Sequence, residues 1–370
     1  MKKLFTSESV TEGHPDKLCD LISDSILTAY LRKDKDTRAG IETVAGKNNI
    51  FITGEITSSA KIDIEKVVKA TIKSIGYLGK QDLDYKTCNI IVDISKQSED
   101  IALGTNDNIG GAGDQGMMFG YACNETPELM PLSISLAHAL TKRLTDVRKK
   151  SIISGLGPDG KTQVTVEYND DRISRIDTII ISTEHEESKD IETLKTEIIK
   201  EVINKEIPSD LIDGNTKILI NPTGRFVIGG PLGDSGLTGR KIIVDTYGGH
   251  ARHGGGAFSG KDPTKVDRSA SYMARHIAKN IVAHHYADKC EIQISYAIGI
   301  KEPIAVNLNT FNTNKISEDE ILEKILKTFD LTPRGIIKHL KLRNIDYTKT
   351  TNYGHFGKKD LPWENVLSDF

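Results

Sequence analysis

Glycine is concentrated in two stretches of the chain, and this clustering limits what those stretches can fold into. Of the 32 glycines, six lie within residues 104–120 and eleven within residues 229–260. Glycine adopts positive φ at little steric cost, so such stretches supply turns, or places where the backbone approaches another group closely. For glycine alone, the turn interpretation is favoured.

Charged side chains accompany the second glycine stretch, and they favour a binding site there over turns alone. They are Arg225, Asp234, Arg240, Lys241, Asp245, Arg252, His253, Lys261, Asp262, Lys265, Asp267 and Arg268. Backbone N–H groups can contact an anion, and Arg and Lys side chains neutralise it. The combination favours a polyphosphate ligand.

Helix and strand patterns alternate on either side of the glycine stretches. Apolar residues at helical spacing predict a helix that begins near Pro15 and further helices at 64–75, 132–148, 191–203 and 267–286. A capping box from Ser317 to Glu320 opens another helix. β-branched runs predict strands at 50–57, 88–94, 163–168, 172–182, 217–220, 241–246, 291–300 and 304–309. Strand pairs interleaved with single helices predict an α+β fold whose sheets are covered on one face by helices.

Composition excludes several classes of protein. A chain of 370 residues with 37% hydrophobic residues supports two or three compact units and is too apolar to be disordered. The net charge of −3 lacks the basic footprint of a nucleic-acid binder, and no apolar run approaches the ~20 residues of a membrane span. We therefore expect neither nucleic acid nor membrane as a partner.

Cysteine spacing and the N-terminus favour the cytoplasm. Cys19, Cys88, Cys123 and Cys290 are far apart, which predicts neither a CxxC metal site nor a disulfide scaffold. Polar residues follow Met1 directly, where a secretory signal would need an apolar stretch. Both features are typical of a protein in a reducing compartment.

Residues 12–17 (EGHPDK) place two acids, an imidazole and a cation around a predicted helix start. A helix N-terminus suits phosphate, and here His14 can donate a hydrogen bond or a proton while Asp16 can hold a hard cation. Taken alone, the segment would be a helix cap with solvated charges; beside the second glycine stretch it indicates a site. Asp16 and Asp267 are candidates to share Mg²⁺, since magnesium takes one or two carboxylates plus substrate phosphates.

Four segments carry a resemblance to a known family. They are residues 12–17 (EGHPDK), 111–116 (GAGDQG), 221–226 (NPTGRF) and 254–262 (GGGAFSGKD). In these segments, and from Leu4 to Gly357 more generally, the sequence resembles the S-adenosylmethionine synthetase, or methionine adenosyltransferase, family. The resemblance implies that the sulfur of L-methionine attacks C5′ of ATP and expels triphosphate, which is then hydrolysed to phosphate and diphosphate.

The resemblance also implies an architecture. Three structurally similar α+β domains are expected at residues 1–98, 114–228 and 229–370, with an active-site lid at 99–113 that is shorter here than in the general family pattern. Residues 151–158 also depart from that pattern. A homodimer with shared active sites is implied, with dimers pairing into a tetramer.

Matched position by position, the resemblance assigns roles to individual residues. ATP contacts fall on His14, Asp159, Lys161, Arg225, Phe226, Arg240, Lys241, Ala257 and Lys261. Methionine contacts fall on Glu55, Gln97, Asp234 and Lys265. Catalysis is assigned to His14, Lys161, Arg240, Lys241, Lys261 and Lys265, two Mg²⁺ ions per site to Asp16 and Asp267, and K⁺ to Glu42.

Other interpretations stay open at this point. One is a different Mg²⁺-dependent enzyme, kinase-like or ATP-hydrolysing, that uses the same phosphate site. Another is a nucleotide-binding regulatory module. For single residues, Glu55 is also compatible with an exposed strand carboxylate, and Lys265 with a solvated cation.

Overall fold

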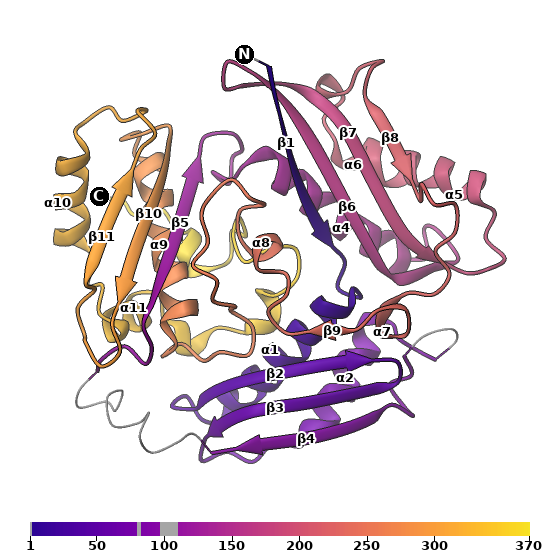
Figure 1. Cartoon of the computed structure of the whole chain (residues 1–370), viewed down its shortest axis with the longest axis horizontal. Helices are drawn as coiled ribbons and strands as arrows, with labels where there is room; N and C mark the ends of the chain where they lie inside the picture. The colour runs from indigo at the N-terminus through magenta and orange to yellow at the C-terminus, as the bar shows by residue number, and fades with distance from the viewer. Residues whose placement is uncertain (1, 80–82, 97–109) are drawn as a thin grey trace.

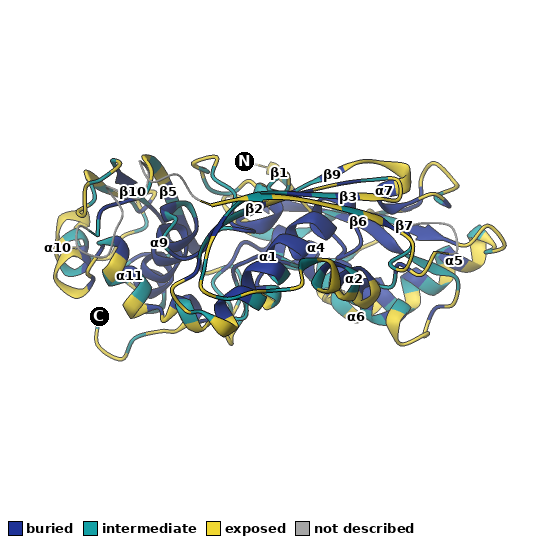
Figure 2. Cartoon of the chain, turned by 90° about the horizontal axis from the view of Figure 1, so that it is seen from below, coloured by how far each residue is buried: buried dark blue, intermediate teal, exposed yellow. Residues whose placement is uncertain are grey.

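A computed structural model describes residues 2–79, 83–96 and 110–370, and shows three sheets, each with helices on one face (Figure 1). The predicted α+β class is therefore confirmed. The strands line one broad side of the molecule and the helices the other (Figure 2). Among the described residues, no helix has the length and apolar character needed to cross a membrane.

The first sheet has the order β4-β3-β2-β9. Its strands are β2 (Arg38–Gly46), β3 (Asn49–Thr57), β4 (Asn89–Ser95) and the short β9 (Gly236–Leu237). Helices α1 (Pro15–Lys33) and α2 (Ile64–Ile75) pack on one face. Local sequence fixes both helices: Pro15 is in the first turn of α1, and α2 runs from the Asp63 cap to Gly76, which has φ 108°.

The second sheet has the order β1-β6-β7-β8. Its strands are β1 (Lys2–Val10), β6 (Leu156–Asn169), β7 (Arg172–His185) and β8 (Lys217–Ile220). It packs with helices α4 (Leu132–Lys149), α5 (Ile191–Ile198) and α6 (Asn204–Glu206); a π-helical turn, Ile199–Ile203, joins the last two. Its hydrophobic core is separate from that of the other two sheets.

The third sheet has the order β11-β10-β5. Its strands are β5 (Gly116–Cys123), β10 (Lys289–Tyr296) and β11 (Ala305–Asn309). Helix α9 (Val266–Ala283) lies on this sheet, with α10 (Glu318–Thr328) and α11 (Pro333–His339) nearby (Figure 1). The predicted capping box at Ser317 and Glu320 is present at the start of α10.

Each sheet includes a strand from a distant part of the sequence. The N-terminal strand β1 pairs with β6, β5 pairs with β10, and β9 pairs with β2. The three sheets are thus interlocked. The domain limits at 98, 113 and 228 divide the sequence, and they remain a prediction.

The predicted strand at 241–246 is wrong. The segment forms a short helix, α8 (Ile242–Asp245), after the small helix α7 (Gly230–Gly233) and strand β9. Lys241 contacts Asp16, and Asp245 contacts the adjacent Lys17. One helical turn brings positions four apart close enough to reach adjacent residues of α1, whereas a strand would hold them ~13 Å apart.

Candidate active site

His14 caps the N-terminus of α1 and is buried. Its Nδ1 accepts a hydrogen bond from the Asp16 backbone N–H at 3.1 Å. Burial, and then the charges of Lys241 and Lys161, lower the pKa of His14 to about 3. The imidazole is therefore neutral at physiological pH. With Nδ1 as acceptor, its proton is on Nε2, which leaves His14 a hydrogen-bond donor rather than an acid.

Asp16 connects the helix start to the second glycine stretch. Its carboxylate accepts a hydrogen bond from Lys241 Nζ at 2.6 Å and another from the Leu237 backbone N–H at 3.0 Å, and Arg240 lies 3.9 Å away. Burial alone would raise the pKa of Asp16, but these hydrogen bonds lower it overall. Asp16 is thus an ionised carboxylate already surrounded by cations.

Buried charges hold this arrangement in place. The Lys17 ammonium is fully buried and contacts both Asp20, at 3.0 Å, and Asp245. The Asp20 carboxylate also accepts a hydrogen bond from the Gly239 backbone N–H at 2.8 Å. Lys17 and Asp20 therefore tie the segment carrying Arg240 and Lys241 to α1. The resemblance assigned no role to Lys17, Asp20 or Asp245, although Lys17 lies in the EGHPDK segment.

Asp159 and Lys161 approach from the start of β6. Asp159 is buried and accepts a hydrogen bond from the Gly230 backbone N–H at 3.0 Å. Burial raises the pKa of Asp159 to about 6. Lys161 is exposed, pairs with Val10 in the β1–β6 ladder, and lies close enough to His14 to lower its pKa. We call His14, Asp16, Lys161, Arg240 and Lys241 the histidine set.

A second group of candidate residues lines a cavity of about 330 Å³ beside β2 and β3. We call Glu42, Glu55, Lys261, Lys265 and Asp267 the cavity set, and Ala257 lines the same space. Lys261 contacts Asp267 at 2.6 Å, and Lys265 contacts Glu55 at 3.4 Å. The pairing agrees with the predicted strand orientation, since Ile52 and Ile56 are buried while Glu55 faces outward.

Two glycines of the second stretch serve packing around this cavity. A Cβ on Gly256 would overlap the Asp267 carboxylate, and one on Gly260, which has φ +81°, would overlap the Ile41 carbonyl. At these positions glycine makes room for a close approach. Close packing therefore explains these two glycines. The evidence for an anion site comes from the charged side chains instead.

Several candidates lie outside both sets. Arg225 is exposed and contacts Glu187 at 2.7 Å, while the Phe226 backbone N–H donates to His185 Nε2 at 3.1 Å. Asp234 is also exposed, although its charge acts on Asp159. Gln97 and most of the expected lid fall outside the described residues.

The two sets are neighbours within one chain but, among the described residues, share no direct hydrogen bond: the Leu237 backbone N–H donates to Asp16, and the next residue, Thr238, lines the cavity. Across the described parts of the chain, hydrogen bonds and ion pairs connect members within each set, but none connects a residue of the histidine set to one of the cavity set. The sequence placed Asp16 and Asp267 in one metal site. In the structure, each of these carboxylates contacts a lysine of its own set.

The donor atoms available for metals are sparse. Among the described residues, no cluster of three or more His, Cys, Asp or Glu side chains is arranged to hold an ion. Single carboxylates fit Mg²⁺ only where substrate phosphates supply further oxygens. Ser259, which the sequence did not single out, lines the same cavity as Glu42, and its buried Oγ has no hydrogen-bond partner.

Comparison with known proteins covers almost the whole chain. Family models described as the N-terminal, central and C-terminal domains of S-adenosylmethionine synthetase match residues 2–99, 109–226 and 228–365. The chain is also similar to S-adenosylmethionine synthase from Clostridium tetani (strain Massachusetts / E88), with 55% identity covering 99% of this chain and 97% of the relative. On both grounds, the chain belongs to the S-adenosylmethionine synthetase family.

Proposed function

We propose that the chain forms S-adenosylmethionine from L-methionine and ATP. The methionine sulfur attacks C5′ of ATP, the C5′–O bond breaks, and triphosphate leaves with the electron pair and is then hydrolysed to phosphate and diphosphate. Family membership supports the overall reaction. The observation that supports the proposed chemistry is the neutral His14 at a helix N-terminus, with Lys161 and Lys241 close enough to shift its pKa.

The histidine set suits a leaving polyphosphate. His14 Nε2–H would donate to a phosphate oxygen, while Lys161, Arg240 and Lys241 neutralise charge that grows as the C5′–O bond breaks. Because these groups are held before substrate binds, little reorganisation is needed in the transition state. Lys261, Asp159, Arg225, Phe226 and Ala257 are proposed to contact ATP.

The cavity set suits the amino acid. Glu55 would pair with the ammonium of methionine and Lys265 would contact an anionic group, in exchange for their contact with each other at 3.4 Å. Asp234 and Gln97 are proposed to complete this site. With sulfur as the nucleophile, no covalent bond to the enzyme is required.

We propose that the two sets face each other across a homodimer. The outer face of the first sheet, which carries Glu42 and Glu55, also carries an apolar row. In this row Val44 lies beside Leu237 on one side and Phe51 on the other, and Phe51 lies beside Ile91. Val44 and Ile91 are 38% and 48% exposed. An exposed apolar row next to half of a site supports a shared interface. Pairing of dimers into a tetramer is proposed from the family resemblance alone.

Metal ions are proposed at both sets. Two Mg²⁺ ions would be held mainly by substrate phosphates, with Asp16 and Asp267 as protein ligands contributed by different chains. The ions would neutralise charge on the leaving triphosphate. K⁺ would lie near Glu42, with the unpartnered Ser259 Oγ as a further oxygen ligand.

We also propose a cytoplasmic location. Cys19, Cys88, Cys123 and Cys290 are free, buried thiols, which is typical of proteins in a reducing compartment.

Product analysis tests the proposed reaction. Purified protein is incubated with ATP, Mg²⁺, K⁺ and L-methionine, and the adenosyl group is followed by mass spectrometry. We expect S-adenosylmethionine, phosphate and diphosphate in equal amounts, and no sulfonium product without methionine. ADP as the main product would instead support the kinase-like alternative, and nucleotide binding without turnover would support a regulatory module.

Asp267→Asn tests the metal assignment. The amide keeps the shape of the side chain but removes the charge that faces Lys261. We expect turnover to fall by about 10² or more with an unchanged circular dichroism spectrum. The control Asp319→Asn changes an exposed residue in the first turn of α10 and should leave turnover unchanged. Near-normal turnover of Asp267→Asn would remove Asp267 from the metal site.

A further inference from the structure

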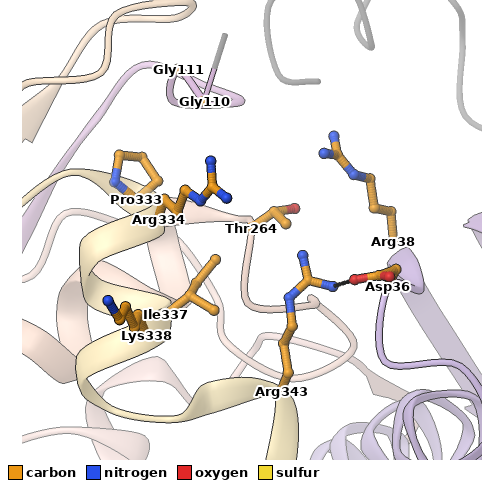
Figure 3. Close-up of a pocket in the computed structure, with 10 residues that line it drawn as sticks. All are labelled: Asp36, Arg38, Gly110, Gly111, Thr264, Pro333, Arg334, Ile337, Lys338 and Arg343. Carbon is orange, nitrogen blue, oxygen red and sulfur yellow. Dashed lines mark hydrogen bonds and ion pairs between the residues drawn. The ribbon is translucent and has the colours of Figure 1, made fainter. Parts of the chain in front are cut away.

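A second cavity, of about 340 Å³, is lined by basic side chains that the proposed reaction does not use (Figure 3). Its charged lining residues are Arg38, Arg334, Lys338, Arg343 and Asp36. We call this space the basic cavity. It lies between the start of β2, the 262–265 loop and helix α11, so it brings together segments far apart in the sequence.

Positive charge predominates in the basic cavity. The lining includes four cations and one carboxylate, and that carboxylate, Asp36, is already in contact with Arg343. Arg334 and Lys338 are exposed and are four positions apart on α11, where like charges repel each other. In the described part of the chain, neither side chain makes a hydrogen bond or ion pair. An anion in the cavity would offset this repulsion.

The wall opposite α11 is fixed by contacts of its own. Arg343 donates to the Lys35 carbonyl at 2.6 Å, and Lys35 Nζ donates to the Arg343 carbonyl at 3.1 Å. These bonds hold the Arg343 guanidinium in place beside Asp36. In Figure 3, Arg334, Arg38 and Arg343 surround the space from different sides, and Thr264 lies between them. The cations are thus arranged around a common volume rather than spread over a flat surface.

Other lining groups indicate the kind of anion. The Thr264 hydroxyl can donate to an oxygen, and guanidinium groups match the geometry of phosphate oxygens. The volume is at the lower end of the range for small-molecule sites, about 300–1,000 Å³. This fits a compact anion with several charged oxygens better than a long chain.

From these observations we infer that the basic cavity binds a small oligophosphate, with diphosphate as the simplest case. The basic cavity is separate from the cavity of Glu42 and Glu55, although the 262–265 loop borders both: Thr264 lines the basic cavity, while Lys265 lines the other. The inference concerns a second anion site and does not depend on the proposed reaction.

Calorimetric titration with inorganic diphosphate tests this inference. Wild-type protein should show two classes of binding event per chain. In the double variant Arg334→Gln/Lys338→Gln, one of the two classes should bind diphosphate at least about tenfold more weakly. Lys261→Gln should lose or weaken the other class, because Lys261 is proposed to contact ATP. Turnover of the double variant should remain that of wild type.

A matched control removes the same charge elsewhere. Lys66 and Lys73 are on α2 and line a groove that also carries Asp63 and Glu65. Lys66→Gln/Lys73→Gln should leave both binding classes intact. Thr264→Val keeps every charge and should weaken only the class affected in the double variant, which provides a second test if that variant folds poorly. The inference is overturned if the double variant binds diphosphate like the control, or if all binding disappears in Lys261→Gln.

Discussion

His14 illustrates how surroundings decide the state of a single side chain. The EGHPDK segment predicted a histidine able to donate either a hydrogen bond or a proton. Burial and two neighbouring lysines lower its pKa to about 3, which leaves only the hydrogen bond in the free enzyme. Lys241 is remote in sequence, so no local pattern could give this result.

The lowered pKa of His14 predicts a pH dependence of stability. Between about pH 3 and 6.5 the unfolded chain binds a proton at this position that the folded chain does not, so stability is lost as the pH falls below 6.5. His14→Gln removes this contribution. We therefore expect the free energy of unfolding of wild type, relative to the variant, to decrease from pH 7 to pH 4 in urea titrations. A difference independent of pH would contradict the assigned pKa.

A buried ion cluster at Glu364 gives a second residue-scale prediction. Its carboxylate accepts hydrogen bonds from Arg275 at 2.9 Å and from Lys279 at 2.8 Å. Glu364→Gln leaves two buried cations without a counter-charge, which should cost about 3–5 kcal/mol of stability. Glu323→Gln, which breaks an exposed pair with Lys327, should cost less than about 0.5 kcal/mol. Equal losses in chemical denaturation would show that burial does not govern these pairs.

At the scale of elements, apolar periodicity predicted the amphipathic helices and the strands that carry β-branched runs. Strands β1, β2, β5 and β9 were missed. In β1, the inward-facing positions near its end are Ser7 and Ser9, which bond to Ser133 and His138 rather than to apolar groups. Their partners lie more than a hundred residues away. Pairings of this kind depend on tertiary structure and leave little local signal.

The packing of α9 on β5 gives an element-scale prediction. A Cβ on Gly120 would overlap the backbone of Ala274, so the helix lies directly against the strand. Gly120→Ala must push these elements apart and should cost about 1–3 kcal/mol or more. Gly46→Ala, at the end of β2, meets nothing within 4 Å and should change stability by less than about 0.5 kcal/mol. Thermal unfolding of both variants provides the comparison, and an unshifted melting temperature for Gly120→Ala would refute the close contact.

At the scale of the whole molecule, the sequence indicated most candidate residues but not their division into two sets. Motifs give residue types in order along the chain, whereas the division follows from tertiary structure. Glu42 and Glu55 share a cavity with the segment that leads into α9, while Asp16 contacts Lys241. The resemblance implied a site shared between two chains, and this remains a prediction.

The apolar row on the first sheet predicts an oligomer that depends on it. Val44→Asp/Ile91→Asp places two carboxylates on the proposed interface and should give monomers with little activity. Val366→Asp, at a position 52% exposed near the C-terminus, should leave the oligomer intact. Analytical ultracentrifugation distinguishes these outcomes. An active oligomer of the double variant would place the interface elsewhere.

The proposed shared site takes its histidine set from one chain and its cavity set from another. It is tested most directly by mixing inactive His14→Ala and Lys265→Ala proteins under conditions in which subunit exchange is verified by fluorescence energy transfer. Each mixed dimer would contain one site with neither substitution, so an equal mixture should regain about a quarter of wild-type activity. Activity that stays at the level of the separate variants, despite exchange, would show that each site is built within a single chain.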